Sequence, residues 1–190
     1  MRRHHLVQPF LLAAGIVAAA MATDRVAAQA RSADARSVVE FQRAADAYAF
    51  LHRQVERRLG QLHQRTGRPV DAIEAGELAT AMVAERPAAA EGALFTPSVA
   101  AAFRQLAVNA ARTPGCNPGE LRSGAWVVRQ VNSPATGTTP VNPCIASALP
   151  ALPDELEYRS AGTVLVLVDS HANLIVDILP ALLAGQDLRQ

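Results

Sequence analysis

Three residues near the C-terminus combine types and spacing that could do chemistry. Asp169 and His171 flank a turn between two apolar segments, and Asp177 lies in the second of these segments. Imidazole nitrogens and carboxylate oxygens are ligands for transition metals. However, an aspartate at a strand end often bonds the backbone of its own turn, and Asn173 tolerates a left-handed conformation. We therefore expect these to be turn-forming residues, and a metal site at Asp169, His171 and Asp177 is the alternative.

Two other histidines, His52 and His63, are 11 positions apart in a segment with helical periodicity. On a helix this spacing places them on roughly one side but ~16 Å from each other. They cannot bind one ion together. We expect both side chains to be solvated on the helix surface.

The sequence contains none of the common catalytic motifs. Gly-x-Ser-x-Gly, His-Glu-x-x-His, the P-loop and the dinucleotide fingerprint are all absent. Glu155, Glu157 and Arg159 alternate along an expected strand and would share one face, which indicates an ion-pair ladder. The sequence therefore provides no catalytic residue and no cofactor site.

The N-terminus has the three parts of a secretory signal peptide. Two arginines precede an uncharged apolar run over residues 6–22, and small residues follow at 28–30. We place the cleavage after Ala30, with Ala22 or Ala28 as alternatives, so that the mature chain is 31–190. A retained membrane anchor is the other interpretation, but the run has 17 residues and a spanning helix usually needs ~20. We expect no membrane span after cleavage.

The chain has two cysteines, Cys116 and Cys144, both in the mature part. An even pair in an exported chain predicts a disulfide. The segment between them is rich in proline, glycine and small polar residues, which cannot order it by burial alone. A redox role is disfavoured because the Cys-x-x-Cys spacing is absent.

Apolar periodicity predicts three helices before residue 114. The first, over 37–64, has apolar residues at spacings of three and four. The second covers 73–91, where Pro87 should kink or divide it. The third begins with Thr96 as the cap and Pro97 in the first helical position.

The C-terminal third is typical of antiparallel strands. The expected strands are 156–159, 163–168 and 174–179. Their continuous apolar runs indicate that both faces of the sheet are covered, one by the helices and part of the other by the irregular loop. Trp126 to Val128 is a candidate short strand, with Trp126 as a core residue.

Together these features predict a single α+β domain. Three or four helices would pack on a small antiparallel β-meander, with a disulfide-closed irregular loop between. The helical part is 37–113, the Cys-closed loop is 114–153 and the meander is 154–180.

Charge excludes several partners. The chain has 18 basic and 17 acidic residues, for a formal net charge of +1, and every basic residue is arginine. No basic block marks a nucleic-acid binder or a protein that docks on anionic membranes. The lack of lysine also excludes Schiff-base chemistry on a lysine.

Several short runs in the last third are distinctive. They are Leu-Pro-Ala-Leu-Pro at 149–153, Leu-Glu-Tyr-Arg at 156–159, Val-Leu-Val-Leu-Val-Asp at 164–169 and Ala-Asn-Leu-Ile-Val-Asp at 172–177. With Phe-Thr-Pro at 95–97, this pattern resembles an uncharacterised family of small exported bacterial proteins. Over 149–178 it is also similar to periplasmic proteins of the RcnB type, which are linked to nickel and cobalt homeostasis. The second resemblance implies a shared β unit and transfers no metal site.

We therefore expect a non-catalytic exported protein of the cell envelope, periplasmic or secreted, that binds a partner protein or a small ligand. A periplasmic metal-binding or metal-responsive protein is the first alternative. An unrecognised hydrolase is the second, and it should show a deep pocket with polar groups converging on it.

Overall fold

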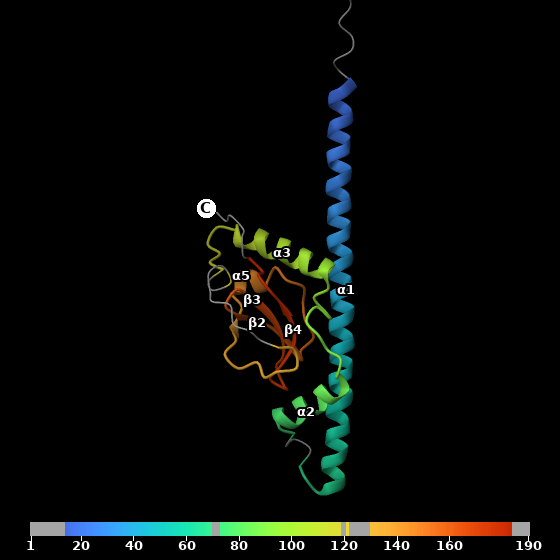
Figure 1. Cartoon of the computed structure of the whole chain (residues 1–190), viewed down its shortest axis with the longest axis vertical. Coiled ribbons are helices and arrows are strands. Elements are labelled where there is room, and N and C mark those ends of the chain that lie inside the picture. The colour runs from blue at the N-terminus through green and yellow to red at the C-terminus, as the bar shows by residue number, and fades with distance from the viewer. Residues whose placement is uncertain (1–13, 70–72, 119–120, 122–129, 184–190) are drawn as a thin grey trace, which may run out of the picture.

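The computed structural model describes residues 14–69, 73–118, 121 and 130–183, and for 14–31 and 33 it describes the backbone alone. In chain order the elements are α1 (Ala14–Thr66), α2 (Ala75–Glu85), α3 (Pro97–Ala111), β1 (Thr139–Pro140), α5 (Pro143–Ala146), β2 (Leu156–Ala161), β3 (Val164–Asp169) and β4 (Leu174–Leu179). This is the predicted α+β fold, with helices packed on an antiparallel meander (Figure 1). The candidate strand at Trp126 lies outside the described residues.

Helix α1 runs along one side of the body and projects well beyond it (Figure 1). It begins at Ala14 rather than at Ser37, because the alanine-rich segment before residue 37 has high helix propensity. The helix therefore passes through the predicted cleavage site, and signal cleavage remains a prediction. At its other end Gly67 has a φ of 72°, and the Arg68 amide donates to the His63 carbonyl over 2.8 Å. This is a left-handed helix C-cap that glycine adopts without strain.

The next two helices lie close to their predicted positions. Helix α2 ends at Glu85, so Pro87 terminates the predicted helix instead of kinking it. Helix α3 begins with Pro97 in its first turn, as predicted. The Thr96 side chain does not cap it; its hydroxyl instead donates to Glu40 of α1 over 2.9 Å.

The sheet has the strand order β1-β2-β3-β4, with every pair antiparallel. The three predicted strands are present, and the sequence analysis missed β1, which has only two residues, one of them proline. The predicted ion-pair ladder forms only in part. Arg159 contacts Glu157 at 2.9 Å, whereas Glu155 accepts from Arg53 of α1 at 2.6 Å.

Both faces of the sheet are covered, as predicted. Leu165 and Leu167 face the helices and join a core that contains stacked and edge-on aromatic rings, among them Phe41 and Phe103 at 4.7 Å. The valines of β3 alternate to the other face, where Val131 and Ala135 from the loop before β1 help to cover them.

Strand β4 contains a bulge that reverses its alternation. Leu167 pairs with Asp177 but Val168 pairs with Ile175, so Val176 is an extra residue. The bulge places Asp177 on the helix side of the sheet. There its carboxylate accepts from the amides of Gly92, Leu94 and Phe95 at 2.8, 2.6 and 2.7 Å, fixing the segment that leads into α3.

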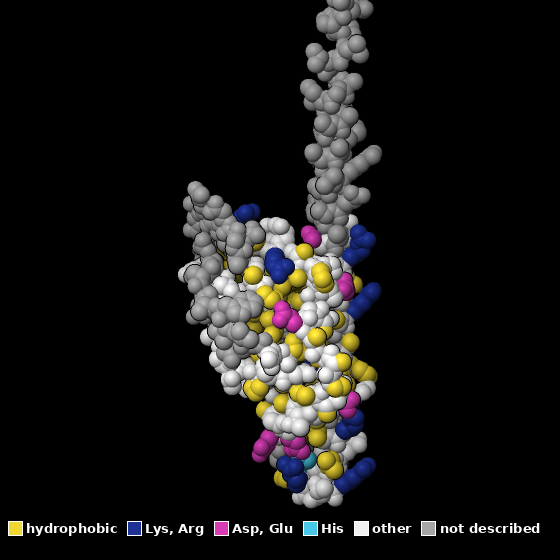
Figure 2. Space-filling model, viewed as in Figure 1, with side chains coloured by type: hydrophobic (Ala, Val, Ile, Leu, Met, Phe, Trp, Pro, Cys, Tyr) yellow, Lys and Arg dark blue, Asp and Glu magenta, His cyan; other side chains and the backbone are white. Residues whose placement is uncertain are grey.

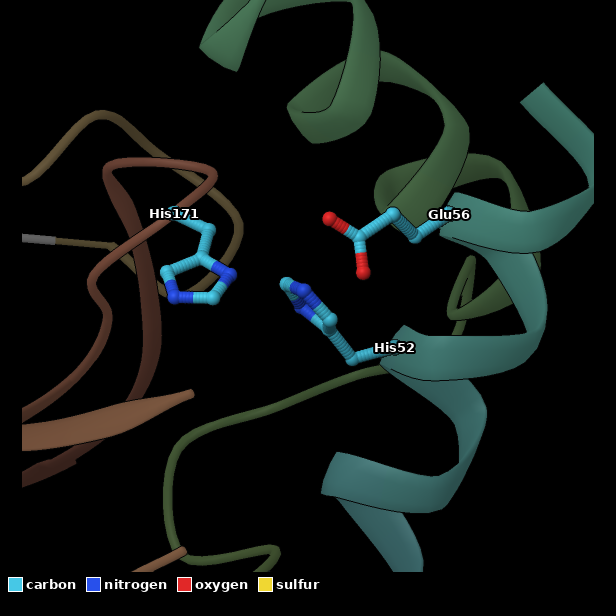
Figure 3. A group of neighbouring side chains, drawn as sticks. All are labelled: His52, Glu56 and His171. Atoms are coloured by element: carbon cyan, nitrogen blue, oxygen red, sulfur yellow. The ribbon is translucent and has the colours of Figure 1, made fainter. Parts of the chain in front are cut away.

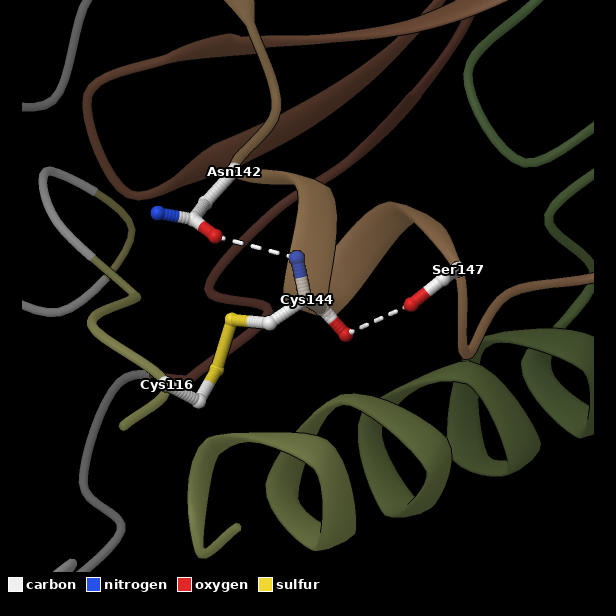
Figure 4. Close-up of a disulfide and its surroundings, with 4 residues drawn as sticks. All are labelled: Cys116, Asn142, Cys144 and Ser147. Atoms are coloured by element: carbon white, nitrogen blue, oxygen red, sulfur yellow. Dashed lines mark hydrogen bonds between the residues drawn. A yellow bond between two sulfur atoms is a disulfide. The ribbon is translucent and has the colours of Figure 1, made fainter. Parts of the chain in front are cut away.

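The structure contains the predicted disulfide between Cys116 and Cys144 (Figure 4), whose Cα atoms are 5.7 Å apart. It ties the segment after α3 to the short helix α5. The Asn142 side chain caps α5 by accepting from the Cys144 amide at 3.0 Å. Closing this 28-residue separation stabilises the fold by about 3–4 kcal/mol on the chain-entropy model.

The surface carries no concentrated charge on the face seen in Figure 2, where arginine and acidic side chains are interspersed along the α1 edge. Within the described residues, no helix combines the length and the apolar character needed to cross a membrane.

Candidate functional site

The expectation that His52 and His63 are solvated is wrong, because both side chains are fully buried. His52 lies four residues after Tyr48 and three before Val55, and both of these are core residues of α1. It therefore occupies a core position of the buried stripe. This spacing was visible in the sequence and would have identified His52 as an inward-facing histidine.

Asp169, the last residue of β3, connects His52 to the β3–β4 turn. Its Oδ2 lies 2.6 Å from Nδ1 of His52 and accepts from the Tyr48 hydroxyl at 2.7 Å. Its Oδ1 accepts from the amides of His171 and Ala172 at 3.1 and 2.8 Å. One buried carboxylate thus shapes the turn, as its position at a strand end predicts, and also orients the ring of His52.

The charges at this cluster are set by burial and by these bonds. Burial alone would raise the pKa of Asp169, but hydrogen bonds from His52, the Ala172 amide and Tyr48 outweigh it and hold the pKa below its usual range. Burial, with the charge of Asp169, raises the pKa of Tyr48 so that it remains a phenol. Because an ionised carboxylate only accepts, the proton between Asp169 and His52 lies on Nδ1.

The other nitrogen of His52, Nε2, is not used by the contact with Asp169. Nε2 is buried and makes no hydrogen bond with any described residue. Glu56, one turn along α1, and His171, on the β3–β4 turn, point into the same space (Figure 3). One ligand atom from each of these three residues lies within 4.8 Å of the other two.

This geometry suits a metal ion with little rearrangement. Tetrahedral ligands with metal bonds of 2.0–2.2 Å would be roughly 3.4 Å from one another. Glu56 is half-buried and His171 is exposed, so both side chains can move inward by rotation. Asp169 fixes His52, and a carboxylate behind a ligating imidazole is the usual outer partner of such a site.

The structure brings together only part of the set predicted from the sequence. His171 is in the cluster, Asp169 stands behind it as the partner of His52, and Asp177 is engaged with the amides before α3. Sequence reasoning missed Glu56 as well as His52. Their spacing of four on one helix was the available signal, because it puts an imidazole and a carboxylate on the same face.

His63 shows how this helix satisfies a buried histidine when no ligand is needed. Its Nδ1 lies 3.1 Å from the Pro69 carbonyl, and its Nε2 lies 2.9 Å from Glu77 of α2. Both ring nitrogens have acceptors within the protein. A buried histidine on α1 can therefore bond both of its ring nitrogens, and the unbonded Nε2 distinguishes His52 from His63.

An open hollow of about 400 Å³ adjoins the cluster on one side, where Glu56, Arg57 and Gln61 line it. It gives solvent a route to Glu56. Neither His52 nor His171 lines this hollow or the three others found beside Val39, Tyr48 and Leu59 of α1. The cluster is thus a ligand set at the edge of the core, and the deep convergent pocket expected of a hydrolase is not seen among these hollows.

The chain was also compared with known proteins. No family model, no curated protein and no solved structure matches it. The function must therefore be argued from the site.

Proposed function

We propose that this protein is an exported metal-binding protein that holds one late first-row transition metal ion, in the series from cobalt to zinc, at His52, Glu56 and His171. This is the first alternative of the sequence analysis, a metal-binding protein, rather than its leading expectation of a protein that binds a partner protein or a small ligand. The proposal depends above all on one observation: Nε2 of His52 is buried without a partner among the described residues, in a side chain whose ring lies within ligand distance of Glu56 and His171.

A cation satisfies this cluster better than a proton does. Buried polar atoms almost always have a partner, and an unpaired one costs about 1–3 kcal/mol. A proton on Nε2 would pair with Glu56 but would leave the ring of His171, 5.2 Å from that of His52, without a role. A divalent ion uses both imidazoles and neutralises the carboxylate.

The ligand types select the metal class. Two imidazoles and one carboxylate suit cobalt, nickel, copper and zinc, whereas calcium and magnesium prefer oxygen ligands alone. The disulfide supports export, since such bonds persist in oxidising compartments, and we place the protein in the periplasm or outside the cell.

The test is metal titration of the chelator-treated protein by calorimetry and thermal unfolding. We expect one equivalent of zinc, nickel or cobalt to bind and to raise the melting temperature, with about 2.7 kcal/mol of stabilisation at a free concentration 100-fold above Kd. His171→Ala should abolish this response without unfolding the protein, because the side chain is exposed.

His63→Gln provides the matched control. It changes a buried histidine on the same helix that is already fully bonded, so it should lower stability but leave the metal stoichiometry and affinity intact. If the wild-type protein binds no stoichiometric metal, or if His171→Ala binds it as well as the wild type, the proposal is wrong.

A further inference from the structure

A second buried atom without a partner among the described residues belongs to Glu155, which contacts both elements that carry the proposed ligands. Within the described residues, the buried side-chain nitrogen and oxygen atoms that make no hydrogen bond are Nε2 of His52 and Oε2 of Glu155. Since native folds leave few such groups unpaired, two of them in one region call for one explanation.

The fold brings Glu155 to the metal-binding cluster from two directions. Its carbonyl accepts from the amide of Ser170 at 2.9 Å, which places it against the turn that carries His171. Its Oε1 accepts from Arg53 at 2.6 Å, and Arg53 follows His52 on α1. Glu155 thus bridges the two elements that supply the ligands.

The charge of the Glu155 side chain follows from its burial and its hydrogen bonds. Burial alone would raise the pKa of Glu155, but bonds from its own backbone and from Arg53, with the charge of Arg53, hold the pKa below its usual range. The Glu155 carboxylate is therefore ionised and has one oxygen, Oε2, free to accept.

Glu155 does not belong to the group whose ligand atoms lie within 4.8 Å of one another, so we do not assign it as a metal ligand. We propose that Oε2 of Glu155 accepts a hydrogen bond from a water that occupies the fourth coordination position of the bound metal. This inference rests on the proposed function. A water at the fourth position can be exchanged for another ligand. The class of ligand that would replace it is a small monodentate anion.

The physical reason is that three protein ligands leave a tetrahedral ion one position short, which water usually fills. Such a water donates hydrogen bonds strongly because the metal polarises it. An ionised carboxylate nearby holds the water in place and opposes its replacement by an anion. Outer partners of this kind change metal affinity by about 10–100-fold.

The experiment uses the protein loaded with Co²⁺, whose visible absorption reports the ligands of the metal. Thiocyanate added to the wild-type protein should replace the water and change the spectrum with saturation. In Glu155→Gln we expect Co²⁺ to bind about tenfold more weakly, and thiocyanate to bind several-fold more tightly because the opposing charge is gone.

Glu157→Gln is the matched control. It makes the same change two residues later in the chain, in a β2 side chain that is paired with Arg159. It should leave both affinities unchanged. If Glu155→Gln does not fold, Glu155→Asp replaces it. This variant keeps the negative charge but withdraws the acceptor from the water, so it should weaken Co²⁺ binding and tighten thiocyanate binding less than Glu155→Gln would.

The outcomes separate the two proposals. Absence of Co²⁺ binding by the wild type overturns the metal site itself. Co²⁺ binding with no spectral response to thiocyanate shows a closed site and overturns only the water-filled fourth position. Equal thiocyanate affinities in the position 155 and position 157 variants overturn the role of Glu155.

Discussion

At the scale of single residues, Asp169 organises the candidate site. It holds the ring of His52 through one carboxylate oxygen and the backbone at His171 through the other. Two ligands that are far apart in the sequence thus depend on one side chain. Because Asp169 binds Nδ1 of His52, Nε2 is left to bind the metal. An outer-sphere carboxylate selects the ligating nitrogen in this way.

This role predicts the behaviour of Asp169→Asn. The amide keeps the shape but loses the charge that favours Nδ1–H, so zinc affinity measured by competition titration should fall about 10–100-fold. Asp177→Asn is the control, because Asp177 is equally buried on the same sheet but bonds the segment before α3. It should lower the free energy of unfolding by about 1–3 kcal/mol and leave zinc affinity unchanged. Similar zinc affinities in the two variants would refute the special role of Asp169.

Some residues of the candidate site could be predicted from the sequence and others could not. Asp169 and His171 were identifiable because a strand-turn-strand pattern marks the turn they occupy. His52 and Glu56 carried a signal in their spacing of four on one helix face, but it was missed because the apolar stripe can also be drawn through Leu51, which turns His52 toward solvent. The direction of the Asp177 side chain could not be predicted, because the bulge at Val176, which turns it toward the segment before α3, has no clear sequence signal.

At the scale of elements, α1 and α2 are joined by a polar contact as well as by Leu78 and Met82. His63 of α1 lies 2.9 Å from Glu77 of α2, and Arg68 approaches the same carboxylate at 3.4 Å. The hydrogen bond from His63, more than the charge of Arg68, lowers the pKa of Glu77. The folded state therefore favours the ionised carboxylate.

This contact predicts a pH dependence of stability. Because the folded-state pKa of Glu77 is below the ordinary 4.5, its stabilisation is present above that pH and is lost as the pH falls through the folded-state pKa. We expect the free energy of unfolding, measured with urea, to fall less between pH 6 and pH 3 in Glu77→Gln than in the wild type. The exposed Glu74→Gln, three residues earlier, should follow the wild type. Parallel profiles for the wild type and Glu77→Gln would contradict this role.

At the scale of the whole molecule, composition and periodicity were sufficient to predict the α+β class of the fold. The meander follows from apolar runs separated by turn residues, and the disulfide follows from paired cysteines in a chain expected to be exported. The length of α1 was underestimated, because helix propensity before residue 37 carries no amphipathic signal. Strand β1 was missed because its two residues pair with β2 through tertiary contact alone.

The same view of the molecule shows what metal binding would do to it. The proposed ligands come from α1 and from the β3–β4 turn, so a bound ion would join the first helix to the last hairpin. The amides of His171 and Ala172 donate to Asp169 and exchange with solvent when the turn opens locally. A metal held by His171 must leave before this opening, so exchange there should slow.

Hydrogen exchange with and without zinc tests this coupling. We expect the amides of residues 170–173 to exchange at least about tenfold more slowly with saturating zinc, since binding to the closed form opposes local opening by mass action. The segment 86–91, which contributes no ligand, should change little. His171→Ala should show no slowing at the turn. Equal slowing at both segments would mean that zinc stabilises the fold only globally, and would place its binding elsewhere than between α1 and the turn.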